Sequence, residues 1–234
     1  MTRRFQLLAI CAIAFLCLAL PVYGAEGDVV YDVSFADYAG GPVLPWLGKK
    51  GFVPKRDADN QNSVVLTVAD HALVLETKRR SAGLLLSEQD VFGFSRIRIE
   101  WGVDVFPAGA SYLKGVRSEA VMVFVFFGTQ KLPSGSMLVP DSPYFIGLFL
   151  CDSDPVDQAF NGRYFKAGGR YVCVDHAVTG QTVTSDYPIA EAFRRMFGKA
   201  ETPGVSGVGI SIDTESTKGN GIAKAFVKRI EFIR

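Results

Sequence analysis

The stretch FSRIRIEWGVDVF, residues Phe94 to Phe106, alternates apolar and polar residues along its length. A period of two is typical of a β-strand with one buried face, because successive side chains of an extended chain point to opposite sides. The odd positions from Ile97 to Val105 are therefore predicted to face a core, with Trp101 buried. The even positions are predicted to face solvent or a ligand.

The same pattern recurs on both sides of this strand. Two further segments, AVMVFVFFG at 120–128 and YFIGLFL at 144–150, are apolar on both faces, which predicts strands in the middle of a sheet that is covered on both sides. A strand is also predicted after the Gly168-Gly169 turn. The alternating segments are Val29 to Phe35, Val64 to Val68, His71 to Thr77, Val208 to Ile212 and Ala223 to Arg234.

Only one helix is predicted. Asp186 is its expected N-cap, an apolar stripe runs from Ile189 to Phe197, and Gly198 ends it, so that the helix forms a lid on the sheets. The stretches Gly40 to Pro54 and Lys131 to Pro143 are predicted loops. We find no repeat and no linker, and we therefore expect one all-β domain, a β-sandwich with one short helix, over residues 26–234.

The first 25 residues have the layout of a cleaved secretory signal peptide. Arg3 and Arg4 precede an apolar run from Leu7 to Leu20, which is followed by Pro21 and small residues. The run is short for a membrane span of about 20 residues, so we expect cleavage and no stable membrane anchor. The expected location is the periplasm or the extracellular medium.

Cleavage takes the formal net charge from +1 to −1, since the leader carries two arginines and no acid. The near-zero net charge and the lack of a basic patch argue against nucleic acid as a partner. The composition is that of a globular protein with a large core. Removal of the leader leaves Cys151 and Cys173 as the only cysteines, either as a disulfide or as two free thiols on strands that never meet.

The stretch SIDTESTKGNG, residues Ser211 to Gly221, places Asp213, Glu215 and Thr217 on alternate positions. It lacks the glycine and the final glutamate of an EF-hand loop. Asp213 and Glu215 on one face of a strand could instead serve as catalytic carboxylates, although a hydrated strand end is the simpler reading.

A second acidic cluster, Asp152, Asp154 and Asp157, follows an apolar strand. It is a candidate for a structural calcium site, and the alternative is a solvated loop. No other cofactor is expected. His71 and His176 are too far apart for a zinc site with the cysteines, and no serine-hydrolase or nucleotide-binding motif is found.

Trp46 in PVLPWLG is the aromatic residue that we consider for a sugar-stacking platform, because it lies in a predicted loop. The alternative is a loop aromatic that closes one end of the sandwich.

Several segments together resemble a bacterial family of exported proteins known as domain of unknown function 3047, in the same order from about Phe35 onward. Ser118 and Glu119 stand where that family has two adjacent acids, and Glu215 stands where it has a second aspartate. The matching segments are SAGLLL at 81–86, RIEWGVDVFPAG at 98–109, KGVRSEAVMVFVFFG at 114–128, DYPIAEAFRRMFG at 186–198, and ISIDTEST with KRIEF near the end.

The resemblance implies a β-sandwich of the jelly-roll or galactose-binding-like type, with Arg117 and Glu119 facing the Asp213 strand end. The sequence therefore predicts an exported, non-catalytic binding module for a glycan or a cell-envelope polysaccharide. One alternative is a glycan hydrolase or lyase that uses Glu119 with Asp213 or Glu215. Another is a structural envelope protein without a small ligand.

Overall fold

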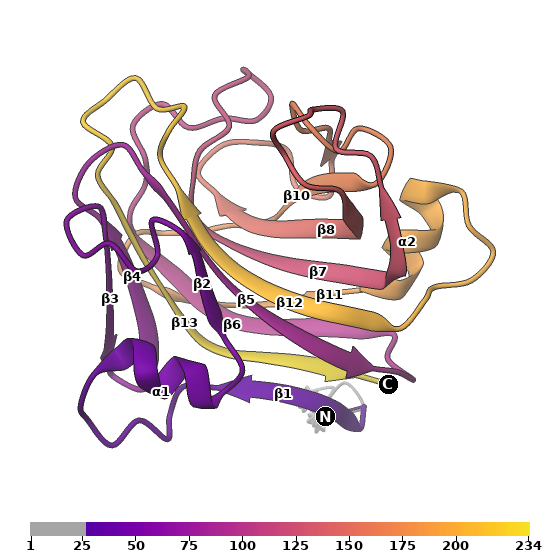
Figure 1. Cartoon of the computed structure of the whole chain (residues 1–234), viewed down its shortest axis with the longest axis horizontal. Helices are drawn as coiled ribbons and strands as arrows, with labels where there is room; N and C mark the ends of the chain where they lie inside the picture. Colours follow the sequence, from indigo (N-terminus) through magenta and orange to yellow (C-terminus); the bar gives the residue numbers. More distant parts are fainter. Residues whose placement is uncertain (1–26) are drawn as a thin grey trace, which may run out of the picture.

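The computed structural model describes residues 27–234, so the predicted signal peptide lies outside the described residues. The chain forms two β-sheets that stack face to face (Figure 1), and the all-β sandwich is confirmed. The six-stranded sheet contains, in order, β11 (Thr182–Tyr187), β6 (Arg96–Val105), β13 (Ala223–Ile233), β4 (Ala72–Thr77) and β3 (Val64–Ala69), with β1 (Val29–Ser34) also paired to β13.

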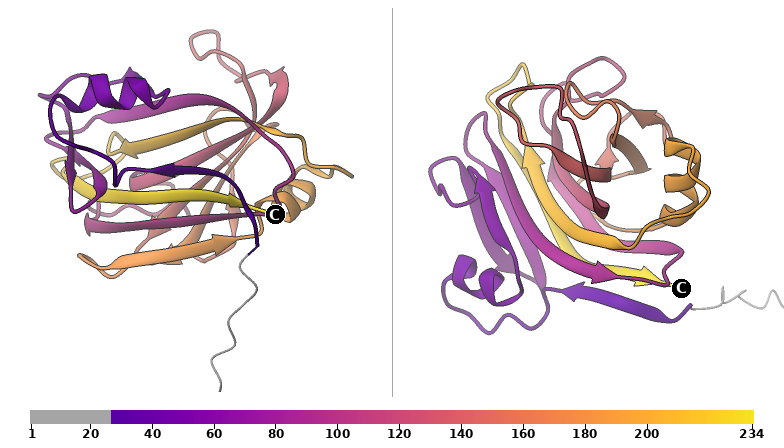
Figure 2. Two further views of the ribbon diagram at one scale, coloured as in Figure 1. Left: turned by 90° about the horizontal axis from the view of Figure 1, so that it is seen from below. Right: turned by 45° about the vertical axis from the view of Figure 1, so that its right-hand side comes forward.

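The second sheet has seven strands and curls strongly, as the right-hand view of Figure 2 shows. Its neighbouring strands run antiparallel except for β8 and β10, which run parallel. The order is β2 (Val53–Arg56), β5 (Ala82–Val91), β12 (Val205–Asp213), β7 (Glu119–Leu132), β8 (Ser142–Cys151), β10 (Gly169–His176) and β9 (Ala159–Phe160). The chain passes repeatedly from one sheet to the other, as in jelly rolls.

The main core lies between the two sheets. On β6 the predicted inward positions Ile97, Ile99, Trp101 and Val103 are all at most 1% exposed, which confirms the alternation over this part of the strand. Val105, also predicted to face inward, is 41% exposed at the end of the strand, so the prediction is wrong there. The indole N–H of Trp101 donates to Ser185 Oγ at 3.0 Å, so its one polar atom is satisfied in the interior.

Strand β7 supplies the facing layer of this core through Val121, Val123, Val125 and Phe127. The even positions of the same strand point to the other, concave side of the curled sheet, where Met122 is buried and Phe124 and Phe126 are half-buried. We predicted that β7 would be buried on both faces. Its core face is buried from Val121 to Phe127, whereas Phe124 and Phe126 on its concave face are only half-buried.

The structure has two helices where the sequence predicted one. The additional helix, α1 (Val43–Lys49), lies within the stretch predicted as a loop, and β2 begins at the end of that stretch. A helix of seven residues is too short to show a clear apolar period, and Leu47 is its only fully buried residue.

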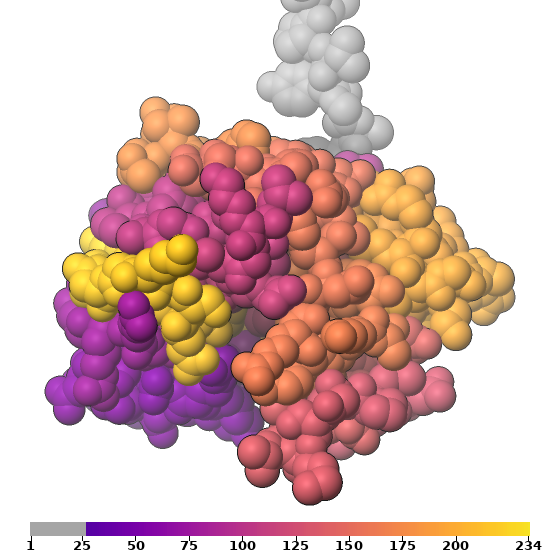
Figure 3. Space-filling view, turned by 90° about the horizontal axis from the view of Figure 1, so that it is seen from above, coloured from indigo at the N-terminus to yellow at the C-terminus, as the bar shows by residue number. Residues whose placement is uncertain are grey.

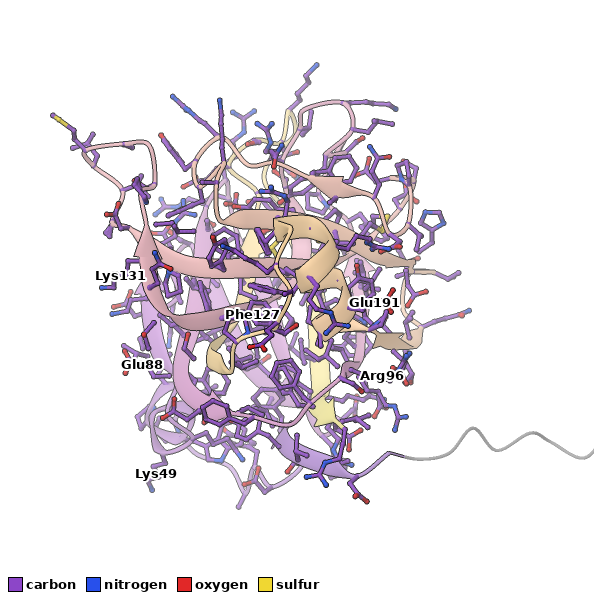
Figure 4. All side chains as sticks on the ribbon, turned by 90° about the vertical axis from the view of Figure 1, so that its right-hand side faces the viewer. Lys49, Glu88, Arg96, Phe127, Lys131 and Glu191 are labelled. Atoms are coloured by element: carbon purple, nitrogen blue, oxygen red, sulfur yellow. A yellow bond between two sulfur atoms is a disulfide. The ribbon has the colours of Figure 1, made fainter. Side chains whose placement is uncertain are left out.

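The predicted helix is α2 (Ile189–Phe197), and Gly198 ends it in the left-handed conformation, as expected. The predicted cap is wrong: Pro188 is the N-cap residue, while Asp186 belongs to β11 and pairs with Arg96. Phe193 of this helix packs on Phe127 with ring centroids 4.6 Å apart, and Figure 4 shows α2 over that end of the sandwich.

Cys151 and Cys173 form a disulfide, with their Cα atoms 5.7 Å apart. Cys151 ends β8 and Cys173 lies within the neighbouring strand β10, so the alternative of strands that never meet is wrong. No helix within residues 27–234 has the length and apolar character needed to cross a membrane.

Candidate functional site

The concave face of the seven-stranded sheet carries a row of aromatic rings. Phe124 and Phe126 of β7 lie 5.9 Å apart and nearly parallel, and both contact Phe145 of β8, while Tyr171 of β10 meets Phe124 edge to face. We call these four residues the aromatic floor. Three of them are half-buried, so ring surface remains open to the solvent on this side of the sheet.

Glycines in the neighbouring strands make room for these rings. A Cβ atom on Gly147 would lie 2.5 Å from Met122 Sδ and 3.1 Å from the Phe124 ring, and a Cβ on Gly169 would overlap the Phe145 ring. Because glycine has no side chain, the rings of Phe124 and Phe145 can approach the backbone of the neighbouring strands closely. The result is an apolar surface of rings that are nearly parallel in the Phe124–Phe126 pair and tilted or edge to face elsewhere.

One end of the concave face is closed by a small second core. The segment 106–118 crosses it and places Tyr112 on Phe149, with ring centroids 4.5 Å apart. Asp154 holds this segment, because its buried carboxylate accepts hydrogen bonds from Ser111 Oγ at 2.6 Å and from the backbone N–H of Tyr112 at 2.7 Å.

Two carboxyl groups meet where the open floor borders this closed end. Glu119, at the start of β7, is the cross-strand partner of Asp213, at the end of β12. The Tyr112 hydroxyl donates to Glu119 Oε2 at 2.8 Å, and Ser211 Oγ lies 3.4 Å from Glu119 Oε1. We call Glu119 and Asp213 the acid pair.

Burial raises the pKa of both members of the acid pair. The pKa of Glu119 rises to about 8, chiefly because the carboxyl is removed from water and secondly because Asp213 lies nearby. The pKa of Asp213 rises to about 6, again chiefly by burial, although the Arg56 guanidinium opposes the shift. Glu119 is therefore protonated and Asp213 mostly ionised at neutral pH.

Arg56, on the edge strand β2, joins the two acids of the SIDTESTKGNG stretch. Its guanidinium lies 3.3 Å from Asp213 Oδ2 and 2.7 Å from Glu215 Oε2. The backbone N–H of Glu215 also donates to Asp213 Oδ1 at 2.9 Å. Asp213, Glu215 and Arg56 thus form an ion-pair cluster that is partly exposed to solvent.

A cavity of about 190 Å³ reaches Glu119 from the closed end. Lys114 and Ser118 also line it, and the Ser118 hydroxyl is buried without a hydrogen-bond partner among residues 27–234. In Figure 3 a recess opens on this side of the molecule, between the yellow 214–222 loop, the magenta 106–118 segment and the orange loops that follow β8.

The structure brings together three of the predicted ligand-binding residues, Asp213, Glu215 and Glu119, and the exposed Arg117 lies two residues before Glu119 in the chain. Thr217 is near them but buried, and its hydroxyl donates to the carbonyl of Ala108 at 2.5 Å. This bond ties two loops at the rim of the recess, which gives Thr217 a structural part.

Trp46 is not brought to this cluster. It lies on α1, at the far end of the sandwich from the 214–222 loop (Figure 1), and packs edge to face on Tyr38 with centroids 4.9 Å apart. It also packs against buried Phe35 of the main core. This placement matches the alternative reading, an aromatic residue that closes one end of the sandwich.

The three calcium candidates point to different partners. Asp154 accepts hydrogen bonds from the 106–118 segment, Asp157 pairs with Arg195 of α2 at 2.8 Å, and Asp152 is exposed. Within the described part of the chain, the one cluster with metal-ligand spacing contains Cys151, Cys173 and His176, and its two sulfurs are consumed by the disulfide.

Sequence reasoning missed Arg56, Tyr112 and the aromatic floor. The sequence did contain an indication of the aromatic floor, because Phe124 and Phe126 are two residues apart and therefore lie on the same face of β7. From the sequence we predicted only that both faces of this strand would be buried. No sequence motif marks Arg56 or Tyr112: Arg56 reaches Asp213 across 157 residues, and Tyr112 reaches Glu119 only because the 106–118 segment folds back over the sheet.

No family model matches this chain, and no curated protein matches it. Three solved structures give remote likenesses. A mutant of a family 29 carbohydrate-binding module complexed with cellulohexaose is 8% identical, with 89% of this chain and 92% of that chain covered and a TM-score of 0.38. The xyloglucanase domain of NopAA, a type three effector from Sinorhizobium fredii in complex with cellobiose, is 11% identical, with 79% and 95% covered and a TM-score of 0.45.

The third structure is a family 61 carbohydrate-binding module in complex with β-1,4-galactotriose. It is 8% identical, with 80% of this chain and 92% of that chain covered and a TM-score of 0.35. At such TM-scores the likeness is remote, so the site described above rests on the geometry of this chain alone.

Proposed function

We propose that this protein is an exported binding module, acting in the periplasm or outside the cell, that binds a glycan on the concave face of its seven-stranded sheet. The aromatic floor takes the apolar faces of the sugar rings. The acid pair, Arg56 and Tyr112 supply hydrogen bonds to sugar hydroxyls at the end of the floor.

One observation carries this proposal: a group of aromatic rings, three of them half-buried, packs on the concave face beside a cluster of polar groups. Sugar-ring faces are apolar and their edges are polar, so an aromatic surface that ends in hydrogen-bonding groups fits them. An ordinary core would bury these rings fully, and the structure leaves three of the four half-open.

The test is calorimetric titration of the purified protein with a panel of envelope and plant polysaccharides, followed by truncation of one ring. Phe124→Ala removes a central ring of the floor and should weaken the binding of the glycan found by at least about tenfold, since about 1.4 kcal/mol of lost contact produces that change.

The chain offers a matched control. Phe226, on the outward face of β13, is also a half-buried phenylalanine whose ring lies over a glycine, Gly102. Phe226→Ala should leave the glycan affinity unchanged while costing similar stability. Equal losses of affinity in both variants, or no binding to any glycan of the panel, would contradict the proposal and favour a structural envelope protein.

A second candidate function, a carboxylate-dependent glycan hydrolase or lyase, is favoured by the acid pair. Two neighbouring carboxyls whose environments separate their pKa values can divide the acid and base parts of a reaction. Glu119, protonated at neutral pH, would be the acid, and Asp213 would be the base or nucleophile. Release of reducing ends that stops in Glu119→Gln would establish this function, whereas tight binding without release would exclude it.

A further inference from the structure

The cations on the outward face of the six-stranded sheet differ from several of the cations around the recess in their ion pairing. On the outward face of the six-stranded sheet, each cation pairs with an acid, as Lys224 does with Asp104 at 3.3 Å and Lys228 with Glu100 at 3.4 Å. The other paired cations of this face are Arg96, Arg98 and Arg229. That face is therefore close to electrically neutral.

The cations around the recess are different. Lys55, Lys114 and Arg117 form no ion pair with any residue from 27 to 234. All three are exposed, so their charged groups remain free to meet a ligand. Lys55 is far from the other two in the sequence, and Lys114 and Arg117 lie three residues apart, so the three form no continuous basic run.

Lys55 projects from the concave face. It is the cross-strand partner of Leu84, which is the partner of Ser211, and cross-strand partners point to the same side of a sheet. The Ser211 hydroxyl faces Glu119 on that side. Lys55 therefore stands at the β2 edge of the same surface that bears the acid pair.

Arg117 reaches the surface from the other direction. It precedes β7 by two residues, and its positive charge is close enough to Tyr171 of β10 to lower the pKa of that hydroxyl, against the larger rise caused by burial. Lys114 lines the cavity that also reaches Glu119. Unpaired cations thus lie on the edge strand β2 and in the segment that leads into β7.

The acids of the recess are already occupied. Asp213 and Glu215 share Arg56, Asp154 accepts hydrogen bonds from the 106–118 segment, and Glu119 is held by Tyr112. Asp152, on the cavity lining, is the exception because it is exposed. A ligand in the recess therefore meets free positive charges and mostly satisfied negative ones.

We propose, resting on the function proposed above, that the glycan is anionic: a polysaccharide with uronic acid units whose carboxylates pair with Lys55 and Arg117 while its rings lie on the aromatic floor. From β2 to β10 the surface spans five strand spacings, roughly 24 Å along the sheet, which accommodates several sugar units. Guanidinium groups bind planar carboxylates with two parallel hydrogen bonds, which suits Arg117 to a uronate.

The test compares carboxylated polymers with neutral glycans and with their own neutralised forms. Polygalacturonate, alginate and hyaluronan are titrated into the full disulfide-bonded protein beside neutral cellohexaose, xyloglucan and β-1,4-galactan, and the polygalacturonate series includes its fully methyl-esterified form. At least one carboxylated polymer should bind tenfold or more tightly than the neutral ones. Esterification, or amidation for the other two polymers, should remove most of that advantage.

Two variants locate the effect. Lys55→Gln and Arg117→Gln should each weaken the binding of the carboxylated polymer about three- to tenfold and leave the weaker binding of its esterified or amidated form unchanged. Lys224→Gln, on the opposite face, removes the same charge and should change neither affinity.

The possible outcomes separate the two proposals. Equal affinity for the charged and the neutralised polymer, or binding of neutral glycans alone, overturns the anionic ligand and leaves glycan binding in place. No binding to any polymer overturns both. Dextran sulfate bound as tightly as the best uronate, with equal losses in all three variants, would show a general attraction for polyanions and also overturn the inference.

Discussion

Replacement of Glu119 by glutamine should make the protein more stable at alkaline pH, and the effect should vanish in acid. Glutamine has the size of glutamate, can still accept the hydrogen bond from Tyr112, and carries no charge at any pH. The variant therefore removes only the cost of ionising a carboxyl that is 6% exposed.

The size of the effect follows from proton linkage. The pKa of Glu119 is about 8 in the folded state and 4.5 as the reference for the unfolded chain. Between these values the unfolded chain loses the proton and the folded protein keeps it, so the wild-type free energy of unfolding falls as the pH rises. At about 1.4 kcal/mol per pKa unit, the loss attributable to Glu119 between pH 5 and pH 8 is roughly 4 kcal/mol.

The assay is urea unfolding at pH 5, 6.5 and 8 without reductant. The wild type and Glu119→Gln should agree closely at pH 5 and diverge by several kcal/mol at pH 8, with the variant more stable. Glu88→Gln, an exposed position on β5, should follow the wild type throughout. Parallel curves for wild type and Glu119→Gln would refute the reasoning, because they would mean that Glu119 ionises in the folded protein as it does in the unfolded chain.

Three further perturbations test other parts of the structure. Replacing Cys151 and Cys173 together by serine should cost roughly 3 kcal/mol of stability, since the bridge closes a loop with a sequence separation of 22, and denaturant unfolding measures the loss. Asp154→Ala should cost at least about 2 kcal/mol, since it leaves the buried donors of the 106–118 segment without their acceptor, and should speed hydrogen exchange of the Tyr112 amide; exchange at the wild-type rate would contradict that role. Trp46→Ala should lower the melting temperature and leave glycan affinity unchanged, and a matching loss of affinity would return Trp46 to the site.

Much of the fold was predictable because it depends on local periodicity. The alternation on β6 identified the strand, its inward face and the burial of Trp101, since a period of two assigns every side chain to one of two faces. The sequence pattern could not predict α1, because a helix with a single buried residue shows no helical repeat of apolar positions. It also misplaced the cap of α2, because Asp186 is held in β11 by its ion pair with Arg96, a partner that only the tertiary structure supplies.

The candidate site was predictable only in part. Glu119, Asp213, Glu215 and Arg117 came from the sequence and from the resemblance it carries. That resemblance, like export to the periplasm, stays a prediction. Trp46 was chosen because it was expected in a loop, and the structure places it on a helix against the core.

By itself the sequence determined that the chain is a sandwich and which residues form most of its core. The tertiary structure decided that Arg56 meets Asp213 across a separation of 157 residues, that Tyr112 closes one end of the concave face, and that the other end stays open. The physical reason is that side-chain direction depends on neighbours in the chain, whereas strand order, register and loop path depend on contacts between distant segments. The two unpaired cations could not be grouped from the sequence for the same reason. Lys55 and Arg117 lie on one surface only because β2 and β7 belong to the same sheet.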